Sequence, residues 1–177
     1  GLSLPLNLTR SKYYQYLKFS TRINITQVSN YEFPMRYISQ AGNGGLRSLQ
    51  YFISYSRLLK ISKRDIQSRW GQSLFIMYNH TPLGGNYKSD RLAIEGNLFF
   101  PGLGKHHSLQ IRGGYQKQTI DNYAFSTPLF IPRGDTYKSY TYFSNASIEY
   151  RLPLFYPDIA IGPLVNIQRV KANLFYD

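Results

Sequence analysis

Few residues in this sequence have the types and the spacing that catalysis or metal binding requires. The chain has three histidines and no cysteine, which excludes a thiolate metal site and a cysteine nucleophile. His106 and His107 follow a glycine-rich turn, but a zinc site needs a third ligand and no carboxylate lies nearby in the sequence. His80 stands alone at a predicted strand end, and nothing singles out a serine that it could activate. We therefore predict no enzymatic activity, no metal site and no cofactor.

The glycine-rich segments and the charge exclude further classes. Residues 42–45 and 84–85 are predicted turns, and neither precedes a predicted helix whose N-terminus could hold a phosphate. The formal net charge of +12 first suggests nucleic acid or an anionic membrane surface. The basic residues do not form one cluster, however, but gather in short breaks between apolar-patterned segments. We therefore predict no nucleic-acid partner.

Side chains alternate between apolar and polar along most of the chain, which is the period of a β-strand. In residues 49–56, for example, Leu, Tyr, Ile and Tyr alternate with Gln, Phe, Ser and Ser. The pattern predicts about eight strands and no helix, with strands near residues 1–7, 13–25, 49–56, 66–79, 91–100, 109–116, 140–152 and 159–176.

The connections between the predicted strands alternate in length. Short connections fall at residues 9–12, 61–65, 101–105 and 153–158, and longer ones at residues 29–45, 81–89 and 118–138. This alternation is typical of an antiparallel up-and-down barrel with tight turns at one rim and long loops at the other. A soluble β-sandwich shows no such alternation.

Alternation alone does not decide whether the apolar side chains face a soluble core or lipid. Predicted strands of about 9 to 15 residues exceed the usual ~5 to 6 residues, which favours a membrane barrel. Aromatic residues also cluster near the predicted strand ends, as they do at a membrane interface. We therefore predict an all-β transmembrane barrel, whose lumen would receive polar side chains that include Lys18, Arg22, Glu95, Arg112, Glu149 and Arg151.

Three motifs follow one another in the last third of the chain. Arg133-Gly134 lies near the middle of the long loop 118–138, residues 147–154 read Ser-Ile-Glu-Tyr-Arg-Leu-Pro-Leu, and the chain ends on Phe-Tyr-Asp177. This order resembles the Arg-Gly-aromatic loop tip, the Glu-x-Arg strand and the Phe-x-Asp strand of the surface-antigen superfamily of BamA, TamA and the two-partner-secretion transporters. Asp135 stands where that superfamily usually has an aromatic residue. The spacing and the high Tyr, Asn and Lys content are most similar to members from Bacteroidota.

The resemblance implies a barrel of the bacterial outer membrane that inserts or translocates proteins by strand pairing and loop movement. Its barrels have sixteen strands, so residues 1–177 would form one segment of a larger barrel; a closed eight-stranded barrel is the alternative. The implied partners are outer-membrane lipid, lipopolysaccharide and other outer-membrane or periplasmic proteins. A passive pore, an adhesin barrel and a barrel hydrolase are the alternative functions.

The resemblance also implies a positional lock at the tip of the loop. Arg133 would fold into the lumen, held out of bulk water, and pair with Asp177, with Glu149 nearby. Gly134 would allow the tip to turn sharply. The predicted strand at residues 159–176 changes phase, so a β-bulge near residues 168–170 would be needed to turn Asp177 toward the lumen.

Overall fold

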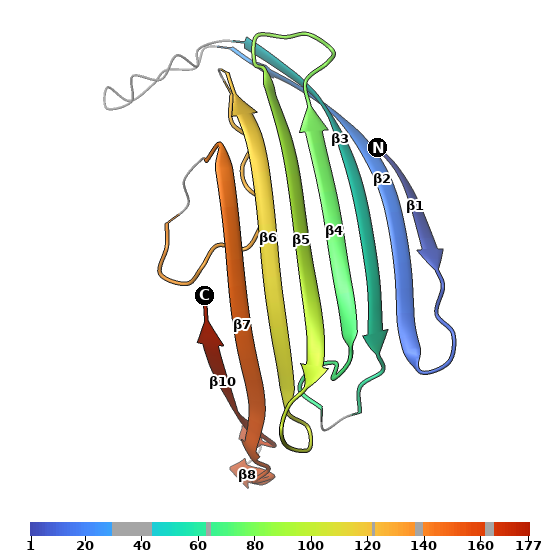
Figure 1. Cartoon of the computed structure of the whole chain (residues 1–177), viewed down its shortest axis with the longest axis vertical. Helices are drawn as coiled ribbons and strands as arrows, with labels where there is room; N and C mark the ends of the chain where they lie inside the picture. The colour runs from blue at the N-terminus through green and yellow to red at the C-terminus, as the bar shows by residue number, and fades with distance from the viewer. Residues whose placement is uncertain (30–43, 63–64, 122, 137–139, 162–164) are drawn as a thin grey trace.

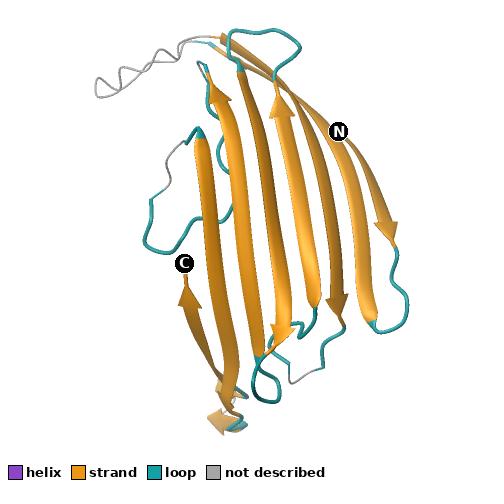
Figure 2. Cartoon of the chain, in the orientation of Figure 1, coloured by secondary structure: helices purple, strands orange, loops and turns teal. Residues whose placement is uncertain are grey.

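A computed structural model describes residues 1–29, 44–62, 65–121, 123–136, 140–161 and 165–177. None of these residues forms a helix, so the described part of the chain offers no helical membrane span (Figure 2). The strands are β1 (Leu2–Asn7), β2 (Tyr13–Val28), β3 (Gly44–Leu59), β4 (Gly71–His80), β5 (Ser89–Pro101), β6 (Ser108–Ile120), β7 (Tyr142–Phe155), β8 (Ile159–Ile161), β9 (Val165–Ile167) and β10 (Val170–Tyr176).

Eight of the strands form one antiparallel sheet in the order β1-β2-β3-β4-β5-β6-β7-β10 (Figure 1). Each strand from β1 to β7 pairs with its neighbour in sequence, and β8 and β9 form a separate hairpin before β10. The predicted all-β, antiparallel up-and-down arrangement of about eight strands is confirmed. The sheet is open, with β1 and β10 at its edges, so a closed eight-stranded barrel is not what the described residues form.

Two predicted strands have different boundaries in the structure. The strand predicted at residues 66–79 begins only at Gly71, because Ser68 holds the end of the preceding connection in place. The Ser68 hydroxyl donates to the carbonyl oxygens of Leu59 at 3.0 Å and Trp70 at 2.8 Å, and a bifurcated contact of this kind ties the two strand ends together. The segment predicted as a single strand at residues 159–176 divides into β8, β9 and β10.

The pairing of β7 with β10 shifts by one residue after Val170, and Leu154 is the residue of β7 left out of the register. The change of phase in the sequence predicts a bulge on the segment before β10, whereas the extra residue lies on β7. The shift has the expected consequence. Phe175 lies opposite Glu149, and alternation then puts Asp177 on the same polar side of the sheet.

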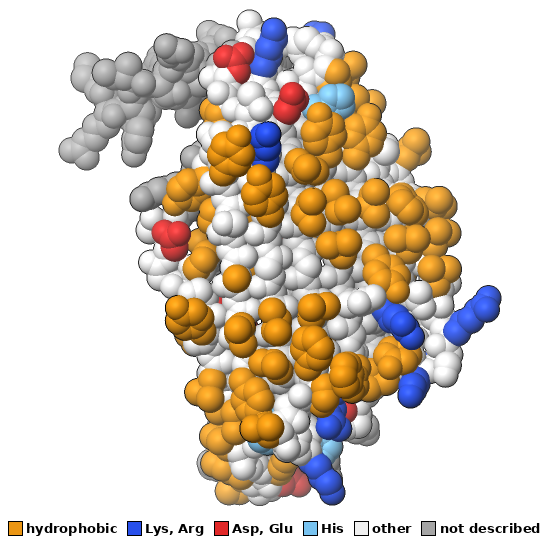
Figure 3. Space-filling view, in the orientation of Figure 1, with side chains coloured by type: hydrophobic (Ala, Val, Ile, Leu, Met, Phe, Trp, Pro, Cys, Tyr) orange, Lys and Arg blue, Asp and Glu red, His pale blue; other side chains and the backbone are white. Residues whose placement is uncertain are grey.

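The register divides the sheet into an apolar face and a polar face. Large side chains on the apolar face are exposed, among them Phe19, Tyr51, Ile53, Leu74, Tyr78, Leu98, Ile111, Tyr115 and Ile148. Figure 3 shows this face, with hydrophobic side chains across the middle of the strands and most charged side chains toward their ends. Among the described hydrophobic residues only Ala93, Phe125 and Leu129 are buried, and all three lie on the polar face or on the loop that covers it.

Candidate functional site: a loop anchored on the polar face

The long loop between β6 and β7 lies against the polar face of the sheet. We call its described residues 123–136 the inward loop, because its side chains and backbone contact β5, β6, β7 and β10. Phe125 and Leu129 of this loop are almost fully buried. The apolar composition of the loop therefore corresponds to a segment that packs onto the sheet.

Glu95 on β5 is the most deeply buried acidic anchor of the inward loop among the described residues, with 3% of its side chain exposed. Its Oε1 accepts hydrogen bonds from Arg112 Nε at 2.9 Å and Nη2 at 2.7 Å. Its Oε2 accepts a hydrogen bond from the backbone N–H of Phe130 at 3.1 Å. A buried carboxylate is tolerated only when its oxygens are paired in this way, so the ion pair and the loop backbone stabilise each other.

Residues around Phe130 complete this anchor. The guanidinium of Arg112 lies 4.2 Å from the centroid of the Phe130 ring, and Asn145 on β7 donates a hydrogen bond to the Phe130 carbonyl oxygen. Gly114 on β6 allows the close approach of the loop. A Cβ at Gly114 would lie 3.3 Å from both Leu129 methyl groups and 2.6 Å from Asn145 Oδ1. A side chain at this position would therefore push the loop away from the sheet.

A second anchor holds the start of the inward loop. Arg91 on β5, 5% exposed, donates to Asn79 Oδ1 at 2.7 Å and to the carbonyl oxygen of Ser126. Its guanidinium also lies 5.3 Å from the centroid of the buried Phe125 ring. Two arginines on the polar face therefore hold the loop. Arg91 donates to the Ser126 carbonyl oxygen, and the Arg112 guanidinium lies over the Phe130 ring.

The tip of the inward loop contains the residues of the predicted lock, and the structure brings them together. Arg133 forms an ion pair with Glu149, and its backbone N–H donates to Asp177 Oδ2 at 3.0 Å. Its Nη1 lies 4.0 Å from the same oxygen, and its guanidinium stacks 3.7 Å from the centroid of Phe175. Ser147 donates to the other Asp177 carboxylate oxygen at 2.5 Å.

Gly134 makes the turn at the tip possible. The N–H of Asp135 donates to the carbonyl oxygen of Pro132 at 3.2 Å, and Gly134 has a φ of +89° at the third position of this four-residue turn. A turn with positive φ at that position strongly favours glycine. Asp135 stands where the superfamily that these motifs resemble usually has an aromatic residue. Its side chain is exposed and so takes no part in packing the tip.

Arg133 is less buried in the described sheet than the lock prediction expects. Its side chain is 45% exposed, because it covers the edge of the polar face at β7 and β10 rather than entering a closed space. Glu149 also has a second partner, since its other oxygen accepts from Arg151. The ion pair of Arg133 is therefore partly screened by water, and its loss leaves Glu149 still paired.

The anchors at Glu95 and Arg91 are not predicted from the sequence. Alternation places Glu95 and Arg112 on the polar face, but nothing local assigns them to each other or to Phe130. The register supplies that assignment: Glu95 lies opposite Gly114, so Arg112 is its diagonal neighbour on the same face. Counting outward from the short turn at residues 102–107 could have found this pair.

His106 and His107 lie at the end of the sheet where the short connections are. His106 donates from Nδ1 to Asp65 at 2.7 Å, which brings a carboxylate to it from a distant part of the sequence. Burial raises the pKa of Asp65, but hydrogen bonds from His106 and Ser62 outweigh that effect and leave the pKa below its usual value. His107 bonds the hydroxyl of Tyr150 at 2.8 Å through Nδ1. The first contact joins two neighbouring short connections, and the second ties the connection before β6 to strand β7.

His80 lies at the opposite end of the sheet, on the apolar face. Its ring stacks on Tyr51 and Tyr78, with centroid distances of 5.7 Å and 5.2 Å. Within the described residues, no three side chains of His, Asp or Glu gather as a metal site would require.

Comparison with known proteins adds no assignment. No family model matches the chain, and neither the comparison with curated proteins nor that with solved structures finds a match.

Glu95→Gln tests the buried anchor, because it keeps the size of the side chain and removes its charge. We expect the free energy of unfolding to fall by about 2 kcal/mol, since Arg112 and the Phe130 N–H both lose a charged acceptor. Amide hydrogen exchange at Phe130 should accelerate. Asp135→Asn is the control, because among the described residues the Asp135 side chain accepts a hydrogen bond only from the neighbouring Thr136 N–H. Equal exchange at Phe130 in both variants would contradict this role of Glu95.

Arg133→Ala tests the tip. We expect a cost of only about 1 kcal/mol, smaller than that of Glu95→Gln, because the guanidinium is half exposed and Glu149 keeps Arg151. Arg133→Lys should lie between the wild type and Arg133→Ala, since it keeps the charge but loses the planar stack on Phe175. Denaturant unfolding measures all three proteins. A loss of ~3 to 5 kcal/mol, as for a fully buried ion pair, would show that the tip is shielded from water.

Proposed function

We propose that this chain forms part of a transmembrane β-barrel of the bacterial outer membrane, with its apolar face against lipid. One observation carries the proposal: large apolar side chains remain exposed on one face of the eight-stranded sheet, while the other face is polar and covered by the inward loop. Apolar patches beyond a few hundred Å² mark surfaces that meet a membrane or another protein. A lipid surface suits a face that runs across every strand of the sheet.

The aromatic residues on the apolar face support the membrane placement. Tyr51 and Tyr78 lie opposite each other toward the long-loop end, and Trp70 packs edge-to-face on Phe100 at 5.8 Å toward the other end. Tyr78 and Trp70 are 78 − 70 = 8 residues apart. That separation is about 26 Å along a strand at ~3.3 Å per residue, before any tilt. The apolar band of an outer-membrane barrel is about 25 Å tall and is bordered by two such aromatic girdles.

Within this class, we assign the chain to the barrels that insert or translocate proteins at the outer membrane. The support is the tip of the inward loop, where the Arg-Gly, Glu-x-Arg and Phe-x-Asp motifs meet through Arg133, Glu149 and Asp177. These are the motifs on which the resemblance to the BamA and TamA superfamily depends. In this proposal the barrel has sixteen strands and works by strand pairing and loop movement, with lipid, lipopolysaccharide and outer-membrane or periplasmic proteins as partners.

Ile53→Arg tests the contact with lipid, and Ser54→Arg is its matched control. Ile53 lies on the apolar face in the middle of β3, opposite Phe19 and Ile76, whereas Ser54 lies on the polar face. A lipid-facing arginine costs about 2 to 4 kcal/mol of insertion at the bilayer midplane and less toward the interfaces, so Ile53→Arg, which lies two residues from Tyr51, should reduce the fraction protected from protease in phospholipid vesicles. Ser54→Arg should insert like the wild type. Equal insertion of the two variants would contradict the proposal that the apolar face contacts lipid.

The assembly function is tested in cells that carry Glu95→Gln or Arg133→Ala in the protein at its natural level. If the inward loop serves assembly, the amounts of other barrel proteins in the outer membrane should fall while the variant itself is still inserted. Quantitative mass spectrometry of outer membranes measures both, with Asp135→Asn as the control. An unchanged outer membrane, together with ion conductance by the purified protein in a planar bilayer, would favour the passive pore.

A further inference from the structure

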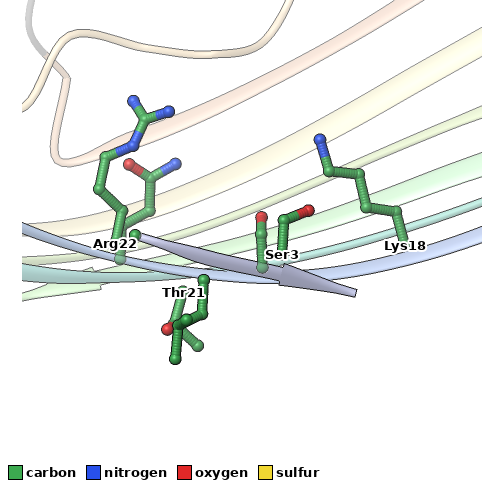
Figure 4. Close-up of a pocket in the computed structure, with 8 residues that line it drawn as sticks. Ser3, Lys18, Thr21 and Arg22 are labelled. Carbon is green, nitrogen blue, oxygen red and sulfur yellow. The ribbon is translucent and has the colours of Figure 1, made fainter. Parts of the chain in front are cut away.

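The first three strands carry two basic side chains on the polar face, far from the inward loop. Lys18 lies opposite Ser54, and Arg22 lies opposite Gln50. Both line a pocket of about 200 Å³ together with Ser3, Ser20 and Gln50. Figure 4 shows Ser3, Lys18 and Arg22 pointing to one side of the sheet, with Thr21 on the other. We call the polar side of β1–β3 around Lys18 and Arg22 the basic face.

Among the described residues, no acidic side chain pairs with the basic face. Strands β1, β2, β3 and β4 contain no Asp or Glu. The acidic residues of the polar face lie on β5, β7 and at the end of β10, and each is paired: Glu95 with Arg112, Glu149 with Arg133 and Arg151, and Asp177 with Arg133. Among the described residues, neither Lys18 nor Arg22 forms an ion pair or a side-chain hydrogen bond. The acidic side chains of the polar face among the described residues therefore all lie on the β5–β10 side, and the β1–β3 side carries only the two cations.

We propose that the basic face binds an acidic segment of another polypeptide, extended along β2. Lys18 and Arg22 are 22 − 18 = 4 residues apart on one strand, on the same face. Their separation is about 13 Å at ~3.3 Å per residue, which is the distance between carboxylates at positions i and i+4 of an extended peptide. Ser20 lies between them on β2, Ser3 lies opposite Ser20, and Gln50 lies beside Arg22 on β3, so two hydroxyls and an amide can bond the peptide.

The charge of the surface favours an acidic polypeptide over a second copy of this chain and over a lipid headgroup. A second copy of this chain would be repelled, because each carries a net charge of +12. A lipid headgroup would need the bilayer on the polar face, whereas the proposed function puts lipid on the opposite, apolar face; the choice of a polypeptide rests on that proposed function. The same net charge attracts an acidic partner and speeds its encounter with the basic face.

The experiment measures binding of a labelled peptide of alternating Glu and Thr to the protein in detergent micelles, by fluorescence anisotropy. In this peptide every second residue is acidic, so its carboxylates share one face. We expect the double variant Lys18→Ala/Arg22→Ala to bind about five- to tenfold more weakly, as expected for the loss of two exposed ion pairs. The control is Arg10→Ala/Lys105→Ala, which removes the same two charges from exposed turn positions and should bind within about twofold of the wild type. A peptide of alternating Gln and Thr should not bind measurably.

Three results would overturn the proposal. Equal weakening in both double variants would mean that the net charge alone attracts the peptide. Full competition by inorganic phosphate at equal charge concentration would indicate a small-anion site. Loss of binding to phosphatidylglycerol vesicles in Lys18→Ala/Arg22→Ala alone would place the basic face against lipid. Peptide binding is measured in micelles, and membrane insertion is measured with Ile53→Arg in vesicles. The peptide proposal can therefore fail while the membrane proposal holds, and the reverse.

Discussion

The two-residue period of the strands is the constraint on which the rest of this structure depends. Ile53 and Ser54 are neighbours in sequence, yet one faces the apolar side and the other the polar side of β3. The pairing of β2 with β3 runs without interruption from Tyr13 to Val28, so a slip of one residue would move every side chain of β2 to the wrong face. A single sheet with two such different faces needs two different environments. The inward loop provides one of them, and the apolar face needs the other from outside the described residues.

The inward loop and the charges beneath it depend on each other. Glu95 and Arg91 are almost fully buried, and charged groups at that depth must be paired or hydrogen-bonded. The loop backbone also needs hydrogen-bond partners, because the N–H of Phe130 and the carbonyl oxygen of Ser126 lose water when the loop packs on the sheet. Glu95 accepts from Phe130, and Arg91 donates to Ser126, so each polar group of the sheet meets the need of one in the loop.

What could be predicted from the sequence is what local patterns determine. The strand class, the number of strands in the main sheet and the separation of Ile53 from Ser54 follow from alternation alone. The later start of β4 depends on the hydrogen bonds of Ser68, and the depth of Glu95 depends on the path of the loop; neither is a local property. The contact of Arg133 with Glu149 was implied only by family resemblance. The same resemblance gave no measure of its exposure, because exposure depends on what surrounds the open edge at β10.

The inward loop is anchored unevenly along its length. Phe125 and Leu129 are buried, whereas Arg133 at the tip is half exposed and lies at the edge of the sheet. Segments with few buried apolar contacts open at lower free energy than those with many. The tip can therefore leave Glu149 and Asp177 while Phe130 stays bound to Glu95. A loop of this design would respond to a partner at the edge of the sheet without losing its place on the polar face, which is the kind of movement that the proposed assembly function requires.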